Sequence, residues 1–298
     1  MENLLSLAFD NLSSLDGPKI RKGLRQVEGL LAQICLSDPK SSGGGSSPGA
    51  GSDGDSDGGL RQRKDLAQLS RDPAFREFFK LQEGFEWNVA MRLIGTLDRL
   101  AAKSSDGSMD LLMLSALDLI QGILLLHPPS KALFSREQNM NLLLDLMEPY
   151  NCPAIQSATL LTLVVALIDT PRNTRTFEAL DGLLTVTSLF KSRSTSREVK
   201  LKLVEFLYFY LMPETPSIPR ADRRDSVPAI MQRSPSKLAG AFAESRRRSS
   251  RRVGSDEYEP TCTLSTEEKQ GLLSCHLSSV EELVKDLRNC APFGGVML

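Results

Sequence analysis

The sequence predicts an all-α protein, an armadillo/HEAT-like helical solenoid, and three observations support this fold class. Apolar residues recur at helical spacing in successive segments, and no segment alternates apolar and polar residues over more than a few positions. Aromatic residues make up only 6% of the chain, and Leu dominates the apolar set, which suits helix bundles. Successive helix pairs begin about 40 residues apart, the period of armadillo and HEAT repeats, although no repeat consensus is apparent.

Residues 1–39 are expected to form an N-terminal helical hairpin. Apolar residues at helical spacing occupy residues 4–15, and Gly17-Pro18 ends this first helix. A second apolar stripe runs from Ile20 to Ile34, and Asp38-Pro39 ends it. The pair predicts two helices that pack against each other.

Residues 40–59 are almost wholly Gly, Ser, Asp and Pro, so they cannot bury apolar surface and are predicted to be a disordered loop. An armadillo-like helical core is then expected over residues 60–213. Asp72-Pro73 suggests an N-cap followed by a first-turn proline, and capping boxes are predicted at Ser135 and Thr195. The expected core helices span residues 73–81, 86–102, 109–126, 135–147, 153–169 and 196–212.

The helix from Val199 to Met212 is apolar almost all round, so neighbouring helices must cover it on more than one side. Before it, residues 177–190 are interpreted as one short apolar segment followed by a polar loop. The run Tyr208-Phe209-Tyr210 has two interpretations. It is expected to be core packing with one tyrosine hydroxyl at the surface, and the alternative is an aromatic patch that binds a partner.

Residues 214–262 form a basic, Ser/Pro-rich segment that is predicted to be disordered, since prolines interrupt it and apolar residues are few. Four serines in it are candidate phosphorylation sites. Arg precedes Ser226 by three residues, Pro follows Ser234, and three arginines precede Ser249 and Ser250. A phosphorylated serine here could be bound by a 14-3-3-type protein through an arginine cluster. The alternatives are an unmodified linker, or a basic patch for nucleic acid or acidic lipid.

Residues 263–298 are expected to form C-terminal helices that dock on the core. Capping boxes are predicted from Ser265 to Glu268 and from Ser278 to Glu281. The second predicted helix carries an apolar face, which requires a surface to pack against.

The residues that bear chemistry do not assemble into a known catalytic or metal-binding pattern. Phosphate-loop, dinucleotide, zinc-protease, hydrolase and kinase motifs are all missing from the sequence. The five cysteines are scattered without CxxC spacing, and the two histidines do not complete a metal set. Cys275-His276 is adjacent in sequence, but neighbouring helical residues point about 100° apart, which disfavours a catalytic dyad. No catalytic residue, metal or cofactor is therefore expected.

Charge and hydropathy point to a soluble intracellular protein. The formal net charge of -1 gives no indication of a nucleic-acid partner. The N-terminus lacks the basic region and cleavage site of a signal peptide. No apolar run reaches the ~20 residues that a transmembrane helix needs.

Long segments of the chain resemble one family. They are DPAFREFFKLQEGFEWNVAMRLIGTLDRL (residues 72–100), NCPAIQSATLLTLVVALIDTPRNTRTFEALDGLLTVTSLFKSRSTSREVKLKLVEFLYFYLMPE (residues 151–214) and HLSSVEELVKDLRNCAPFGG (residues 276–295). Together with the basic Ser/Pro-rich segment they are similar to the fungal cell division control protein 14 family. This family is the septation initiation network component that shares its name with an unrelated phosphatase.

The resemblance implies a non-catalytic regulatory or scaffold subunit that binds a Ste20/germinal-centre-type protein kinase. It further implies action in the septation initiation network, in cytoplasm and at spindle pole bodies or the division site, where it promotes cytokinesis and septum formation. The alternative function is an adaptor that binds nucleic acid or acidic membrane through its basic segment. The sequence does not locate the partner-binding surface.

Overall fold

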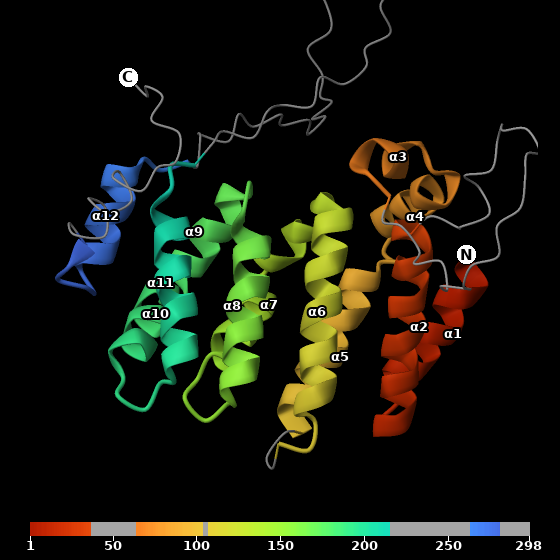
Figure 1. The fold of residues 1–298 in the computed structure, drawn as a ribbon, viewed down its shortest axis with the longest axis horizontal. Coiled ribbons are helices and arrows are strands. Elements are labelled where there is room, and N and C mark those ends of the chain that lie inside the picture. Colours follow the sequence, from red (N-terminus) through yellow and green to blue (C-terminus); the bar gives the residue numbers. More distant parts are fainter. Residues whose placement is uncertain (37–63, 104–106, 215–262, 281–298) are drawn as a thin grey trace, which may run out of the picture.

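The computed structural model describes residues 1–36, 64–103, 107–214 and 263–280, and every secondary-structure element in these ranges is a helix (Figure 1). The all-α prediction is confirmed, while the armadillo or HEAT likeness stays a prediction. The helices are α1 (Glu2–Ser13), α2 (Gly17–Cys35), α3 (Leu66–Arg71), α4 (Pro73–Glu83), α5 (Val89–Lys103), α6 (Asp110–Leu126), the 3-10 helix η1 (Pro128–Ser135), α7 (Glu137–Leu146), α8 (Pro153–Leu167), α9 (Pro171–Ala179), α10 (Gly182–Lys191), α11 (Arg197–Leu211) and α12 (Thr266–Ser274).

The helices form two layers. Figure 1 shows α2, α6, α8 and α11 standing side by side as the nearer layer, and each of them packs against the next. Helices α1, α5, α7 and α10 lie behind them. Helix α12 packs on α11 at the far end of the stack. The nearer layer therefore presents a surface that runs across several helices.

One continuous apolar core joins the two layers. All six apolar residues of the predicted stripe from Ile20 to Ile34 are buried. Helices α1 and α2 cross closely at Gly23, where an added Cβ would lie 2.9 Å from the backbone nitrogen of Leu12. Glycine is needed there because the backbones themselves touch.

Helix starts follow local hydrogen bonding, and two predicted starts are wrong. Asp72 accepts from the Ala74 amide as predicted, and Ser265 forms the predicted capping box with Glu268. Helix α11 is capped by Ser196 rather than Thr195, because the Thr195 hydroxyl donates to the Leu189 carbonyl instead.

The other wrong start is Ser135, which belongs to η1. Its hydroxyl donates to the Ala132 carbonyl, and α7 begins after Arg136.

The chain between α8 and α11 contains two helices where the sequence predicted one short apolar segment and a loop. Pro171 does not lead into a loop after α8, because it stands in the first turn of a new helix, α9. Asp181, with φ of 57°, turns the chain into α10. Gly182 then fits directly against the ring of Phe177, because an added Cβ would lie 2.2 Å from that ring.

The described chain resumes beside the place where it stops. The Lys64 amide donates to the Cys35 carbonyl at 2.9 Å, across residues 37–63. The Leu264 amide donates to the Glu214 carboxylate at 3.0 Å, across residues 215–262. The predicted loop 40–59 and nearly all of the predicted segment 214–262 lie outside the described residues, so the predicted division of the chain stays a prediction.

Within the described part, no single helix has the length and apolar character to cross a bilayer. Helices α6 and η1 meet those criteria only when taken together, with a bend of 120° between them.

Candidate partner-binding site

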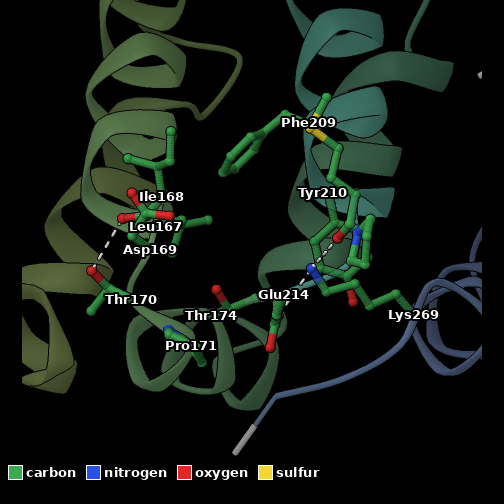
Figure 2. A pocket seen from close by; sticks show the side chains of 12 residues that line it. Leu167, Ile168, Asp169, Thr170, Pro171, Thr174, Phe209, Tyr210, Glu214 and Lys269 are labelled. Carbon is green, nitrogen blue, oxygen red and sulfur yellow. Dashed lines mark hydrogen bonds and ion pairs between the residues drawn. The ribbon is translucent and has the colours of Figure 1, made fainter. Parts of the chain in front are cut away.

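A pocket of about 230 Å³ lies where the corner between α8 and α9 faces the end of α11 and the first turn of α12 (Figure 2). Figure 2 shows Leu167 and Ile168 on one side, with Tyr210 and Lys269 across from them. Most of its lining is apolar. The lining residues are Leu167, Ile168, Asp169, Thr170, Pro171, Thr174, Phe209, Tyr210, Met212, Pro213, Glu214 and Lys269.

The corner between α8 and α9 is held by two buried side chains, Lys131 of η1 and Asn173 of α9. The Lys131 ammonium donates to the Ile168 carbonyl at 3.1 Å. The Asn173 amide donates to the carbonyls of Lys131 and Ala166, at 2.8 and 2.7 Å. Asp169 takes a left-handed conformation with φ of 57°. These bonds satisfy carbonyls that the end of α8 leaves free, and they fix the apolar wall of the pocket.

The opposite wall is an ionic cluster centred on Glu214, whose side chain is only 8% exposed. One of its oxygens, Oε1, lies 2.8 Å from Arg175 Nη2 and 2.9 Å from Lys269 Nζ. The other oxygen accepts from the Leu264 amide. Lys269 also donates to the Met212 carbonyl and lies over the ring of Tyr210. The cluster therefore joins α9, α11 and α12.

A second carboxylate, Glu178, completes the cluster. It accepts from the Tyr210 hydroxyl at 2.6 Å and from Arg175 Nη2 at 2.8 Å. Burial raises the pKa of Glu178, against the opposing effects of the Tyr210 hydrogen bond and Arg175. Burial also raises the pKa of Tyr210 and lowers the pKa of Lys269.

The geometry favours binding over chemistry at this pocket. Lys269 and Glu214 are engaged with each other, so the pocket offers an apolar cavity beside satisfied charges. An apolar side chain of a partner fits such a cavity. Among the described residues, no group of three His, Cys, Asp or Glu side chains is placed to hold a metal ion.

An uncharged surface adjoins the pocket along α8. This helix contains no Asp, Glu, Lys or Arg, although one side of it is not covered by the rest of the fold. Leu161 is 42% exposed, and Ile168, at the pocket, is 40% exposed. We call this side the α8 face. Its residues are Ala154, Ser157, Ala158, Leu161, Val164, Val165 and Ile168, all exposed or half-buried.

Aliphatic side chains are also exposed on the helices that pack against α8. They are Leu125 of α6, Leu201 of α11 and Met212, which directly follows α11. Contiguous apolar surface across several helices is typical of protein-binding sites.

The structure brings some sequence-predicted residues to this site and leaves others out. The candidate phosphorylation sites Ser226, Ser234, Ser249 and Ser250 lie outside the described residues. Cys275 is exposed, and its thiol faces the Gly271 carbonyl.

The three residues of the aromatic run Tyr208-Phe209-Tyr210 lie in different surroundings. Tyr210 is buried, and its hydroxyl reaches Glu178 rather than solvent. Phe209 is half-buried and lines the pocket, and Tyr208 is half-buried. Helix α11 packs against α8, α10 and α12, as a helix apolar nearly all round requires.

Sequence reasoning missed the ionic cluster. Its members come from three separated segments, and single charges next to apolar helices look like ordinary surface residues. The one available signal was Glu214, a carboxylate that follows closely after the apolar helix α11.

Comparison with known proteins gives a consistent result along the whole chain. The family model for Cell division control protein 14, SIN component, matches residues 1–293. A curated relative named Cell division control protein 14, from Schizosaccharomyces pombe, is 28% identical over 304 residues, which cover 99% of this chain and 97% of the relative. No solved structure matches the chain. The chain belongs to the Cell division control protein 14 family of SIN components.

Proposed function

We propose that this chain is a non-catalytic regulatory or scaffold subunit that binds a Ste20/germinal-centre-type protein kinase. The complex acts in the septation initiation network and promotes cytokinesis and septum formation. Family membership supports the network, and the uncharged α8 face beside the pocket supports a protein partner. This exposed apolar surface is the single observation that carries the proposal, because a helix without charges is rarely left facing water.

The subunit can act on the kinase in two ways. It activates the kinase if it binds the active conformation more tightly than the inactive one, since only differential affinity shifts an equilibrium. It localises the kinase, to the spindle pole body or the division site, if it binds both conformations equally. In both cases the pocket beside Phe209 and Met212 receives an apolar anchor side chain of the partner.

The experiment is co-expression of this chain with a Ste20-type kinase from the same source, followed by size-exclusion chromatography. Kinase activity is then measured with and without the subunit. A stoichiometric complex with raised activity supports the regulatory function. A complex without activation supports a localising scaffold, and absence of a complex at micromolar concentration contradicts the proposal.

We also propose that the basic segment, residues 214–262, regulates this subunit through phosphorylation. We expect phosphorylation of one or more of Ser226, Ser234, Ser249 and Ser250 to alter timing or placement, with a 14-3-3-type protein as a reader. If no kinase complex forms, an adaptor that binds nucleic acid or acidic membrane through this segment becomes the leading function. Steeply salt-dependent binding to those ligands would identify it.

A further inference from the structure

We infer that Ser194, in the turn between α10 and α11, is a phosphorylation site for a basophilic protein kinase, and that its phosphate draws Lys191 away from the carbonyl of His276. This inference goes beyond the proposed function, because it holds whether or not the complex with a Ste20-type kinase forms. The turn follows Lys191, the last residue of α10, and leads into α11. Figure 1 shows it at the lower edge of the stack, at the opposite end of α11 from the pocket.

The turn contains four hydroxyl side chains, and three of them hold the backbone in place. The Thr195 hydroxyl donates to a carbonyl of α10 at 2.7 Å. The Ser196 hydroxyl caps α11, and the Ser192 hydroxyl accepts from the Ser194 amide at 3.3 Å. Ser194 is exposed, and its own hydroxyl meets only the Ser192 hydroxyl, at 2.8 Å, within the described part of the chain. A kinase can therefore take up the Ser194 hydroxyl without opening a bond that shapes the turn.

Basic side chains stand on both sides of Ser194 at positions that suit a basophilic kinase. Lys191 lies three residues before it, Arg193 one residue before it, and Arg197 three residues after it. These three side chains are exposed, and none forms an ion pair with the described residues. Kinases select substrates partly by such charge patterns. Ser196 also has an arginine three residues before it, but its capping bond would have to open before it could react.

The reaction is a phosphoryl transfer from ATP that the kinase holds. The Ser194 oxygen forms a bond to the γ-phosphorus, the bond from that phosphorus to the bridging oxygen of ADP breaks, and the hydroxyl proton passes to a base of the kinase. The products are phosphoserine and ADP. A phosphoserine carries about −1.5 to −2 charges at pH 7 and three acceptor oxygens, so it attracts the cations already placed around it.

One of these cations links the turn to the end of α12. The Lys191 ammonium donates to the His276 carbonyl at 2.6 Å, in an exposed position. Three residues of chain span at most roughly 10 Å, so a phosphate on Ser194 lies within reach of this ammonium. The phosphate offers the ammonium a full negative charge, whereas the carbonyl offers only a dipole. Phosphorylation therefore releases the end of α12 from the turn, while Lys269 and Glu214 still hold its first turn.

The first experiment maps phosphate on the full-length chain purified from dividing cells of the same source. Mass spectrometry of peptides that cover residues 191–200 should find phosphate on Ser194, and phosphatase treatment should remove it. Absence of phosphate from this turn overturns the inference, and so does phosphate that is confined to Thr195 or Ser196.

The class of kinase is tested with the purified full-length chain, ATP and the catalytic subunit of cyclic-AMP-dependent protein kinase as a basophilic probe. The same peptides report the phosphate on Ser194. The double variant Lys191→Gln, Arg193→Gln should lower the initial rate at Ser194 by about tenfold, because the charge pattern is lost. Lys200→Gln is the control, since this lysine of α11 lies outside the pattern. Equal rates in the double variant and the wild type would show that these two cations do not direct the kinase.

Hydrogen exchange tests the effect on α12. Ser194→Asp places a negative charge in the turn, and exchange of the amides in residues 275–280 should accelerate by about two- to fivefold, as expected for an exposed charged contact. Ser194→Ala adds no charge and is the matched control, and thermal unfolding verifies that each variant keeps the fold. In a Lys191→Met background the aspartate should have no further effect, because there is no ammonium to draw away. Unchanged exchange in Ser194→Asp, or equal acceleration in the Lys191→Met background, contradicts the role assigned to Lys191.

Discussion

Lys269 Nζ lies 2.9 Å from Glu214 Oε1, so a buried ion pair ties α12 to the residue that follows the last core helix. The side chains are only 5% and 8% exposed. Among the described residues 263–280, the buried apolar side chains beside this pair are Leu273, Leu277 and Val280. The docking of α12 therefore depends on electrostatics as well as on apolar burial.

Lys269→Met should release α12 from the core. The substitution keeps the length of the side chain but leaves Glu214 without one of its two cations, a change that costs about 3 kcal/mol for a buried pair. Hydrogen exchange of the amides in residues 263–280 should accelerate, while exchange in α2 stays slow. Lys202→Met is the control, because the exposed Lys202–Glu205 pair contributes less than about 1 kcal/mol. Equal exchange of α12 in both variants would contradict the role of the cluster.

Gly182→Ala should destabilise the fold by about 1–3 kcal/mol, because a Cβ there must push against Phe177. Phe177 is fully buried and packs edge-on against Phe206 of α11, with ring centroids 5.6 Å apart. Chemical denaturation measures the loss. Gly29→Ala is the control, since a Cβ at that exposed helical position meets nothing within 4 Å and should stabilise α2 by about 0.5–1 kcal/mol. If Gly182→Ala is as stable as the wild type, the Phe177 ring moves away from the added Cβ at no cost in stability.

Glu178→Gln should remove one component of the pH dependence of stability. The folded-state pKa of Glu178 is raised by burial, so its contribution to stability is complete below the unfolded value of 4.5 and is lost as pH rises through the folded value. Gln resembles the protonated acid at every pH. The stability of Glu178→Gln minus that of wild type should thus increase as pH rises above 4.5, by about 1.4 kcal/mol for each pH unit until the folded-state pKa is reached.

Urea unfolding between pH 4 and 8 measures this difference. Glu28→Gln, at an exposed position in the middle of α2, is the control. A difference that is flat with pH would mean that Glu178 is ionised in the folded protein as easily as in the unfolded chain.

The double variant Ser226→Ala, Ser234→Ala should alter septation timing or the localisation of the protein, if the basic segment receives a cell-cycle signal. Purified variant and wild type should have the same melting temperature, because the described fold does not include these residues. Time-lapse microscopy of dividing cells measures the timing. Unchanged timing and placement would remove these two serines from the proposed function.

The sequence predicts a helix well where only one face of that helix is buried, because the apolar residues then recur with a clear helical period. The stripe from Ile20 to Ile34 shows period 3.6, and the structure buries every member. Prediction was wrong around η1 and α9, which both begin with proline. The expected helices 109–126 and 153–169 stop just before Pro128 and Pro171. The helices that begin at these prolines were not predicted, because a proline ends one helix as readily as it starts the next.

The candidate site was less predictable than the fold. Whether Leu161 faces core or solvent depends on which neighbours cover α8, and a helix apolar on all sides carries no periodic signal to decide it. The pairing of Arg175, Glu214 and Lys269 depends on the tertiary arrangement of three helices. Local sequence does not encode such distances.

The paired ends at Cys35–Lys64 and at Glu214–Leu264 have a consequence for how this protein can evolve and be engineered. Because the fold already holds each pair of ends together, the intervening length is nearly free to change. Doubling such a length costs only about 0.6 kcal/mol in closure entropy. Different lineages can therefore lengthen or shorten these two stretches without redesigning the core. A fluorescent reporter domain inserted at either place should leave the helical layers intact.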